Sequence, residues 1–229
     1  MSQEKNKKTV FRRIRGRIIP ISISITGAGM ALDAARTKRV YNTGGITIDK
    51  KTHAFQPFAG ATLGDHLIIK KDGKFAGHAR TYINDGTEHS FSWLGIKKKF
   101  RGQGLSNILA KQAAVEAKDK GGKTFFNHVV HPNSANLFGK DSVNKYYVER
   151  IRKGEQIFER ISKPKAMSRV KTWHSKGFAK NAIFRQTVIP KTLKRSITPF
   201  RTIGNKMKIG LGIGLFITGA SMLFKKGDK

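Results

Sequence analysis

A glycine-rich stretch, Lys97–Ser106, has the residue types and spacing of a phosphate-binding loop. It follows an apolar run that is typical of a strand, Phe91–Ile96, and leads into a run that is typical of a helix, Leu105–Lys120. Gly102 and Gly104 would leave the backbone N–H groups at the start of that helix open to an anion. Lysines and an arginine add positive charge. The stretch therefore predicts a site for a phosphate-bearing ligand, with an ordinary tight turn as the alternative.

The composition of the chain points to a polyanionic partner. The 229 residues include 46 basic and 14 acidic residues, which gives a formal net charge of +32. Charge of this size predicts contact with nucleic acid, an anionic membrane surface, or both. The chain has no cysteine, which excludes disulfides, thiolate metal sites and cysteine nucleophiles. The seven histidines do not have the spacing of a known ligand motif, so we expect no metal site.

Apolar runs separated by turn signals predict the elements that hold the loop in place. Asp72-Gly73 and Lys153-Gly154 have the chemistry of tight hairpin turns. The expected elements in chain order are strands at Leu67–Ile69, Phe75–Ile83 and Ser90–Ile96, a helix at Leu105–Lys120, a strand at Lys123–Val130 and a hairpin at Tyr146–Ile161. This order predicts an α/β (α+β) fold with a mixed, mostly antiparallel sheet and a central helix after the glycine-rich loop.

These features together resemble the acyl-CoA-binding motif of the GNAT superfamily of N-acetyltransferases. That motif is a strand, then Gln/Arg-x-x-Gly-x-Gly/Ala, then a helix. Lys99 stands at the Gln/Arg position, and Gly102 and Gly104 match the two glycines. Downstream, Leu137–Lys140 resembles the family's Leu-Tyr-x-Lys helix. The resemblance covers about Leu67–Ile161.

The resemblance implies that acetyl-CoA or another acyl-CoA is the cosubstrate and that an amine attacks its thioester directly. The loop would bind the pyrophosphate, and a strand-edge N–H would polarise the thioester carbonyl. The residues implied in cofactor binding are Leu94, Gly95, Ile96, Lys99, Arg101, Gly102, Gln103, Gly104, Leu105 and Ser106. The two helices that cover the acceptor site in the family are reduced here to the short stretch Lys50–Asp65.

Candidates for proton transfer lie on the strands that flank the loop and helix. Glu88 and His89 open the strand before the loop, and His128 lies on the strand after the helix, so each is a candidate general base. Each is also explained as an ordinary surface residue. In the family, the tyrosine of the Leu-Tyr-x-Lys helix is the usual general acid. Phe138 stands at that position here, and a phenylalanine cannot donate a proton. Tyr146 and Tyr147 are the nearby substitutes.

Composition divides the chain into four parts. We expect a basic arm with an apolar strand or helix segment at 1–40, a GNAT-like domain at 41–162, a basic, aromatic-containing segment at 163–208 and an apolar glycine-rich helix at 209–229. In the first part, isoleucines alternate with other residues from Ile19 to Ile25, which predicts a strand, and Gly27–Arg39 is typical of a helix. Lys163–Lys208 lacks Asp and Glu, so we expect it to be an arm, independent of the domain, that binds nucleic acid or anionic lipid. The alternative is a disordered basic tail.

The last apolar segment predicts a membrane helix. Ile209–Phe224 has no charged residue, and Gly210, Gly214 and Thr218 follow one another at four-residue spacing. Small residues spaced in this way allow helices to approach closely in a bilayer. A buried terminal helix is the alternative. Together with its basic flanks, the segment predicts an anionic membrane as partner and membrane association as the localisation.

Two functions are consistent with the sequence. The first is a membrane-associated GNAT-like N-acyltransferase that uses acyl-CoA and an amine acceptor. The second is a catalytically lapsed GNAT-fold structural protein that links nucleic acid or an anionic membrane in a larger assembly, such as a virion or a ribosome-like particle. Either protein could act as a homo- or hetero-oligomer.

Overall fold

The computed structural model describes residues 24–52, 62–84, 87–129, 131, 134, 137–138, 143–176 and 182–224. The chain divides into two compact units. One comprises residues 1–38 with 200–229, and the other comprises residues 39–199. The predicted glycine-rich loop and the expected sheet lie in the second unit, which is described first.

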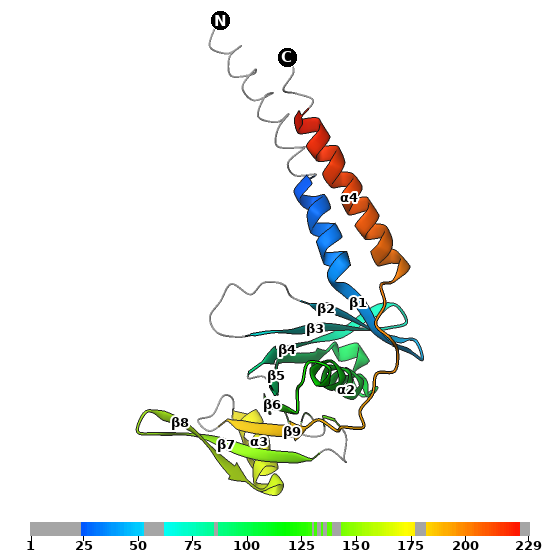
Figure 1. Cartoon of the computed structure of the whole chain (residues 1–229). Helices are drawn as coiled ribbons and strands as arrows, with labels where there is room; N and C mark the ends of the chain where they lie inside the picture. Colours follow the sequence, from blue (N-terminus) through cyan, green and yellow to red (C-terminus); the bar gives the residue numbers. More distant parts are fainter. Residues whose placement is uncertain are drawn as a thin grey trace, which may run out of the picture. The chain divides into compact units, whose positions relative to one another are not determined.

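A nine-stranded sheet forms the second unit (Figure 1). Its strands are β1 (Thr37–Thr43), β2 (Ile46–Thr52), β3 (Thr62–Lys71), β4 (Lys74–Ile83), β5 (Glu88–Ile96), β6 (Thr124–His128), β7 (Asn144–Arg152), β8 (Glu155–Ile161) and β9 (Ile183–Val188). Their order in the sheet is β1-β2-β3-β4-β5-β6-β9-β7-β8. Antiparallel pairs predominate, and β5 pairs with β6 in parallel. The expected fold class is therefore confirmed.

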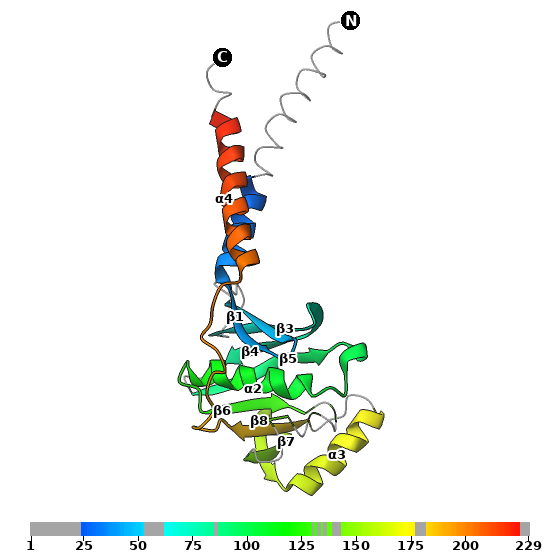
Figure 2. The same cartoon turned by 90° about the vertical axis from the view of Figure 1, so that its right-hand side faces the viewer.

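Two helices cover one face of this sheet. α2 (Leu105–Lys118) lies against the sheet and runs along the neighbouring strands, as Figure 2 shows, and it buries Leu105 and Leu109 in one core with Leu67, Ile69 and Phe125. α3 (Lys163–Lys176) packs against β7 and β9 around a second apolar cluster. Because side chains alternate along a strand, the residues between these core positions point to the opposite face.

The turns that the sequence predicted are present. Asp72 and Gly73 have φ angles of 49° and 74°, and Lys153 and Gly154 have φ angles of 52° and 84°. Two successive positive φ angles match the right-handed twist of the flanking strands, so these turns set the registers of β3–β4 and β7–β8. The meander, the helix after the loop and the hairpin therefore form where the sequence placed them.

The basic segment Lys163–Lys208 is not an arm independent of the domain, which corrects the expectation. Its first part is α3, and its middle is β9, which lies between β6 and β7 in the sheet. Ile183, Arg185 and Thr187 are buried on one face of β9, and the residues between them are more exposed. The backbone of β9 pairs with β6 on one side and with β7 on the other, so this stretch belongs to the sheet.

The other unit contains a helix at residues 24–36 and α4 (Ile203–Phe224), which lie side by side (Figures 1 and 2). Gly27 and Gly212 lie in close contact between the two helices, since a Cβ on Gly27 would lie 2.5 Å from the Gly212 carbonyl oxygen. A Cβ on Gly210 or Gly214 would have no neighbour within 4 Å. The helix pair therefore uses a different face of α4 from the expected one. The alternating isoleucines are helical from residue 24 onward, and residues 19–23 lie outside the described residues.

Across the described part of the chain, no helix is both long enough and apolar enough to cross a membrane. The predicted span over Ile209–Phe224 is therefore not supported. α4 extends back through Lys206 and Lys208, which leaves its uncharged run at residues 209–224. At about 1.5 Å per residue, that run covers about 24 Å, less than a hydrocarbon core of about 30 Å.

Candidate functional site

Strands β5 and β6 separate near the middle of the sheet. Their described pairing consists of Glu88 with Thr124 and His89 with Phe125, although β5 continues to Ile96. The register of β5 against β4 also shifts by one residue, since Phe91 pairs with Thr81 whereas Trp93 pairs with Arg80. Such a bulge bends a strand and increases its twist. The second half of β5, Leu94–Ile96, therefore lies beyond the described pairing with β6.

The glycine-rich loop follows directly at the end of β5. A 3-10 turn, η1 (Lys98–Phe100), leads through Arg101 to Gly104, which caps α2. Gly102 and Gly104 have φ angles of 78° and 71°, in the left-handed region that favours glycine. A Cβ at either position would meet nothing within 4 Å, so the space in front of the loop is open.

Backbone N–H groups of this loop are available to a ligand. No described residue accepts a hydrogen bond from the backbone N–H groups between Gly102 and Ser106. The next N–H groups, of Asn107 and Ile108, donate to the Gly104 carbonyl at 3.0 and 3.2 Å and so close the first turn of α2. Groups left over at a helix N-terminus, together with the helix dipole, favour an anion.

The charged side chains around the loop also favour an anion. The first turn of α2 contains no acidic residue. Lys97, Lys98, Lys99 and Arg101 are all exposed beside it. The Arg101 Nε donates to the Ile96 carbonyl at 3.1 Å, and this bond ties the loop to the end of β5. The side chain of Gln103 accepts a hydrogen bond of 2.6 Å from the Lys71 Nζ.

An aromatic cluster lies beside the separation of β5 and β6. Phe91 and Phe125 stack with ring centroids 4.8 Å apart, and Phe138 lies 6.0 and 5.7 Å from them. Leu137 and Phe138 form a turn, and the φ angle of Phe138 is 77°. The helix expected over Leu137–Lys140 is therefore not present at its first two residues, because that φ angle is incompatible with a right-handed helix. Residues 139 and 140 lie outside the described residues.

Tyr146 is buried next to a buried arginine. The two residues face each other across β7 and β9, and Tyr146 is 2% exposed while Arg185 is fully buried. The Arg185 guanidinium donates to the Ser134 carbonyl at 2.7 Å and lies 5.7 Å from the Phe138 ring. Burial raises the pKa of Tyr146 and lowers that of Arg185 to about 10. The Tyr146 hydroxyl therefore keeps its proton at neutral pH.

The other candidate bases lie on two different faces of the sheet. Glu88 points away from α2, and its two oxygens accept hydrogen bonds from Asn84 at 3.1 Å and Gln186 at 3.2 Å. His128 stacks on Phe184 on that same face, and burial lowers its pKa. His89 instead lies in the core, 5.8 Å from the Phe125 ring. The structure therefore does not bring Glu88, His89 and His128 together.

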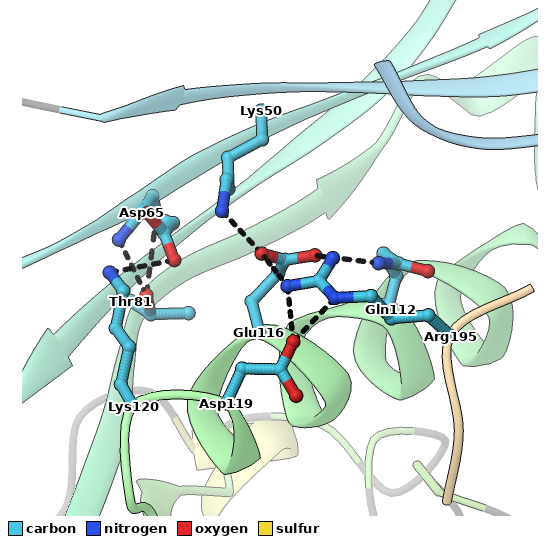
Figure 3. A network of polar contacts seen from close by, with 8 residues as sticks. All are labelled: Lys50, Asp65, Thr81, Gln112, Glu116, Asp119, Lys120 and Arg195. Atoms are coloured by element: carbon cyan, nitrogen blue, oxygen red, sulfur yellow. Dashed lines mark hydrogen bonds and ion pairs between the residues drawn. The ribbon is translucent and has the colours of Figure 1, made fainter. Parts of the chain in front are cut away.

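A buried ionic network, which sequence reasoning missed, lies on the α2 side of the sheet (Figure 3). Glu116 of α2 is 2% exposed and accepts bonds from Lys50 at 2.5 Å, from Gln112 at 2.8 Å and from Arg195 at 2.5 and 2.9 Å. Arg195 also pairs with Asp119. Burial alone would raise the pKa of Glu116, but the hydrogen bonds from Arg195 and Lys50 outweigh it and lower the pKa. The network ties β2 and the segment after β9 to α2.

Comparison with known proteins agrees with this geometry. Residues 38–139 match the model of the family described as "Acetyltransferase (GNAT) family". No curated protein matches the chain. Similar solved structures include a GNAT family acetyltransferase from Elizabethkingia anophelis with acetyl-CoA bound, at 13% identity over 64% of this chain and 99% of that one, with a TM-score of 0.39.

Two further similar structures are named enzymes. The ribosomal-protein-S18-alanine N-acetyltransferase from Escherichia coli is 16% identical over 62% of this chain and 85% of that one, with a TM-score of 0.36. The N-acetylglutamate synthase from Neisseria gonorrhoeae, complexed with coenzyme A and N-acetyl-glutamate, is 14% identical over 55% of this chain and 26% of that one, with a TM-score of 0.36. These likenesses are weak, so the family model and the order of the elements carry the assignment. Residues 38–139 of this chain form an acetyltransferase domain of the GNAT family.

Proposed function

We propose that the unit of residues 39–199 binds acetyl-CoA or another acyl-CoA and transfers the acyl group to an amine. One observation carries this proposal: the open N–H groups of Gly102–Ser106 lie at the end of β5, beyond the point where its pairing with β6 stops. The pyrophosphate would bind the loop, with Lys99 and Arg101 adding charge. The acyl-bearing arm would follow the edge of Leu94–Ile96, whose backbone would polarise the thioester carbonyl.

The reaction also needs a proton for the departing thiolate. Phe138 cannot supply it. Tyr146 is the donor that we propose, because burial raises its pKa and because its neighbour Arg185 lies beside the Phe138 ring. In the proposed reaction the amine nitrogen attacks the thioester carbon, the C–S bond breaks, and the thiolate takes the Tyr146 proton.

Calorimetry with acetyl-CoA tests the cofactor site. Gly104→Val should weaken binding at least about tenfold, because valine is strained at a positive φ angle and its side chain would occupy the space in front of the loop. Gly154→Val is the matched control, since Gly154 also has a positive φ angle and open space but lies in the β7–β8 turn. Absence of binding to the wild-type protein at low salt, or equal binding by both variants, would contradict the proposal. Binding without transfer to any amine would favour the structural alternative.

A second candidate function, association with an anionic membrane surface, is supported by the outer surface of α4. Eight large apolar side chains of α4 are 38–78% exposed: Ile203, Met207, Leu211, Ile213, Leu215, Phe216, Ile217 and Met222. They alternate with Lys206 and Lys208 near the start of the helix. A helix that is apolar around much of its circumference normally packs in a protein core or against lipid. A helix can bind in the interface of a membrane without crossing it, and basic residues beside it add electrostatic attraction to anionic lipids.

Cosedimentation with vesicles tests this second function. The protein should sediment with vesicles of phosphatidylcholine and phosphatidylserine more than with phosphatidylcholine alone. Leu211→Asp should weaken that binding about tenfold or more, because burying a leucine side chain in lipid would contribute about 1.5–3 kcal/mol. Ile151→Asp is the control, since Ile151 is an exposed apolar residue of β7. Equal binding by both variants would exclude α4 as the contact.

A further inference from the structure

A pair of histidines lies on the face of the sheet opposite α2. His66 of β3 and His78 of β4 are hydrogen-bonded, with 2.9 Å between the His66 Nε2 and the His78 Nδ1. Their rings meet edge to face, with centroids 5.2 Å apart, and both side chains are partly exposed. An imidazole held by a second imidazole has one ring nitrogen engaged in the bond and the other directed elsewhere.

The strand register places this pair beside the proposed acyl-CoA edge. His78 lies opposite Gly95 of β5, and Arg80 lies opposite both Trp93 of β5 and His66 of β3. Residues that face each other across antiparallel strands have Cβ atoms about 5 Å apart. Gly95 belongs to the stretch of β5 along which the acyl-bearing arm would bind. His78 lies on β4, the next strand, and so would be one strand away from that arm.

Trp93 lies over Gly95 on this face. A Cβ on Gly95 would lie 2.7 Å from the Trp93 Nε1, so the indole covers the position that a larger residue would fill. Trp93 is 59% exposed, and its ring centroid lies 6.4 Å from that of His78. The Trp93 indole and the His78 imidazole therefore both lie next to Gly95 of β5.

We propose that the His66–His78 pair is the base of the acyl transfer and that the acceptor amine binds on this face, against Trp93. This inference rests on the proposed acyl-CoA site. In the tautomer that this role requires, the His78 Nδ1–H donates to the His66 Nε2, and the His78 Nε2 can accept a proton. As the amine nitrogen bonds to the thioester carbon, its proton passes to that Nε2. The C–S bond breaks, its electron pair leaves with the thiolate, and the imidazolium returns its proton to water.

Burial and a nearby positive charge favour the neutral form of the His78 imidazole. The charged groups on this face include Arg39 of β1, Asp49 and Lys51 of β2, Lys70 of β3, Arg80 of β4 and Glu88 of β5, with Lys97 over the Phe75 ring. Asp49 is already bonded to Arg39 and Lys70. Burial, followed by the charge of Arg80, lowers the pKa of His78. A neutral base is the form that the first proton transfer requires.

The absence of cysteine allows a direct assay, since a thiol reagent then reports only the CoA that is released. Transfer from acetyl-CoA to a panel of a polyamine, a lysine peptide and an aminosugar would be followed from pH 5.5 to 9. His78→Gln should lower kcat about 100-fold at pH 7 and remove the acidic limb of the pH profile, with unchanged acetyl-CoA affinity. His66→Gln should lower kcat about tenfold and shift that limb. His174→Gln, in α3, is the control.

Three results would overturn the proposal. The first is a wild-type pH profile for His78→Gln. The second is a wild-type protein that releases no CoA with any amine of the panel, in which case acetyl-CoA calorimetry shows whether the cofactor site itself survives. The third concerns the wild-type protein alone and so does not depend on how a variant folds. NMR titration should show the two imidazoles titrating as a coupled pair, with His78 below the ordinary histidine pKa, and independent titration would exclude the pair.

Discussion

Arg195, from the segment after β9, forms a two-pronged ion pair with the buried carboxylate of Glu116 in the last turn of α2. Its two terminal nitrogens lie 2.5 and 2.9 Å from the two oxygens of Glu116. The residues are 79 positions apart in the chain. Because a planar guanidinium matches a carboxylate in this geometry, the pair holds the end of the domain against α2.

Breaking this pair from one side should destabilise the domain. Arg195→Ala removes two charge-assisted hydrogen bonds but leaves Lys50 as a charged partner of Glu116, and we expect a loss of about 1.5–3 kcal/mol in the free energy of unfolding. Arg150→Ala is the control, since Arg150 forms a more exposed pair with Glu159 at 3.4 Å and should cost less than about 1 kcal/mol. Urea unfolding of both variants provides the measurement. Similar losses would show that the buried Arg195–Glu116 pair contributes no more to stability than the exposed Arg150–Glu159 pair.

The same carboxylate predicts how stability depends on pH. The pKa of Glu116 is lower in the folded protein than its ordinary value of 4.5. Its contribution to stability is therefore complete above the unfolded pKa and is lost as the pH falls through the folded pKa. Urea midpoints of the wild-type protein should decrease below about pH 4.5 more steeply than those of Glu116→Gln. Parallel pH profiles would contradict the assigned direction of the shift.

The close contact between Gly27 and Gly212 predicts that only one face of α4 rejects a large residue. Gly212→Leu should separate the two helices, because even a Cβ on Gly212 would lie 2.5 Å from the Gly27 carbonyl oxygen. Gly214→Leu, at a position with nothing within 4 Å, should leave the helix pair intact. A nitroxide label near residue 29 and another near residue 210 would report their separation. An unchanged distance in Gly212→Leu would refute the contact.

Tyr146 allows the proposed acid to be tested separately from the base. Tyr146→Phe should lower the rate of transfer from acetyl-CoA about 100-fold, with little change in acetyl-CoA affinity, because it removes a proton and leaves the ring volume almost unchanged. Tyr147→Phe is the matched control on the same strand, since the Tyr147 hydroxyl donates to the Gln186 side chain at 3.4 Å. Equal rates for the two variants would remove Tyr146 from the mechanism.

Local patterns in the sequence were sufficient for the parts of the fold that depend on neighbouring residues. Asp72-Gly73 predicted a hairpin turn because Gly favours positive φ angles, and the structure has them. The run from Leu105 to Lys120 predicted a helix, and α2 begins at Leu105 and ends at Lys118. The loop with Gly102 and Gly104 was likewise found from its composition, because glycines between a strand and a helix are a local signal.

Tertiary structure decided the features that depend on residues far apart in the chain. The composition of Lys163–Lys208 indicated a basic arm, but pairing with β6 and β7 makes part of it the strand β9. The bond between His66 and His78 depends on the register of β3 against β4, which no single stretch of sequence specifies. Glu116 and Arg195 meet for the same reason. Sheet registers and helix packing are set by the sum of many distant contacts, and so these sites could be identified only in the folded chain.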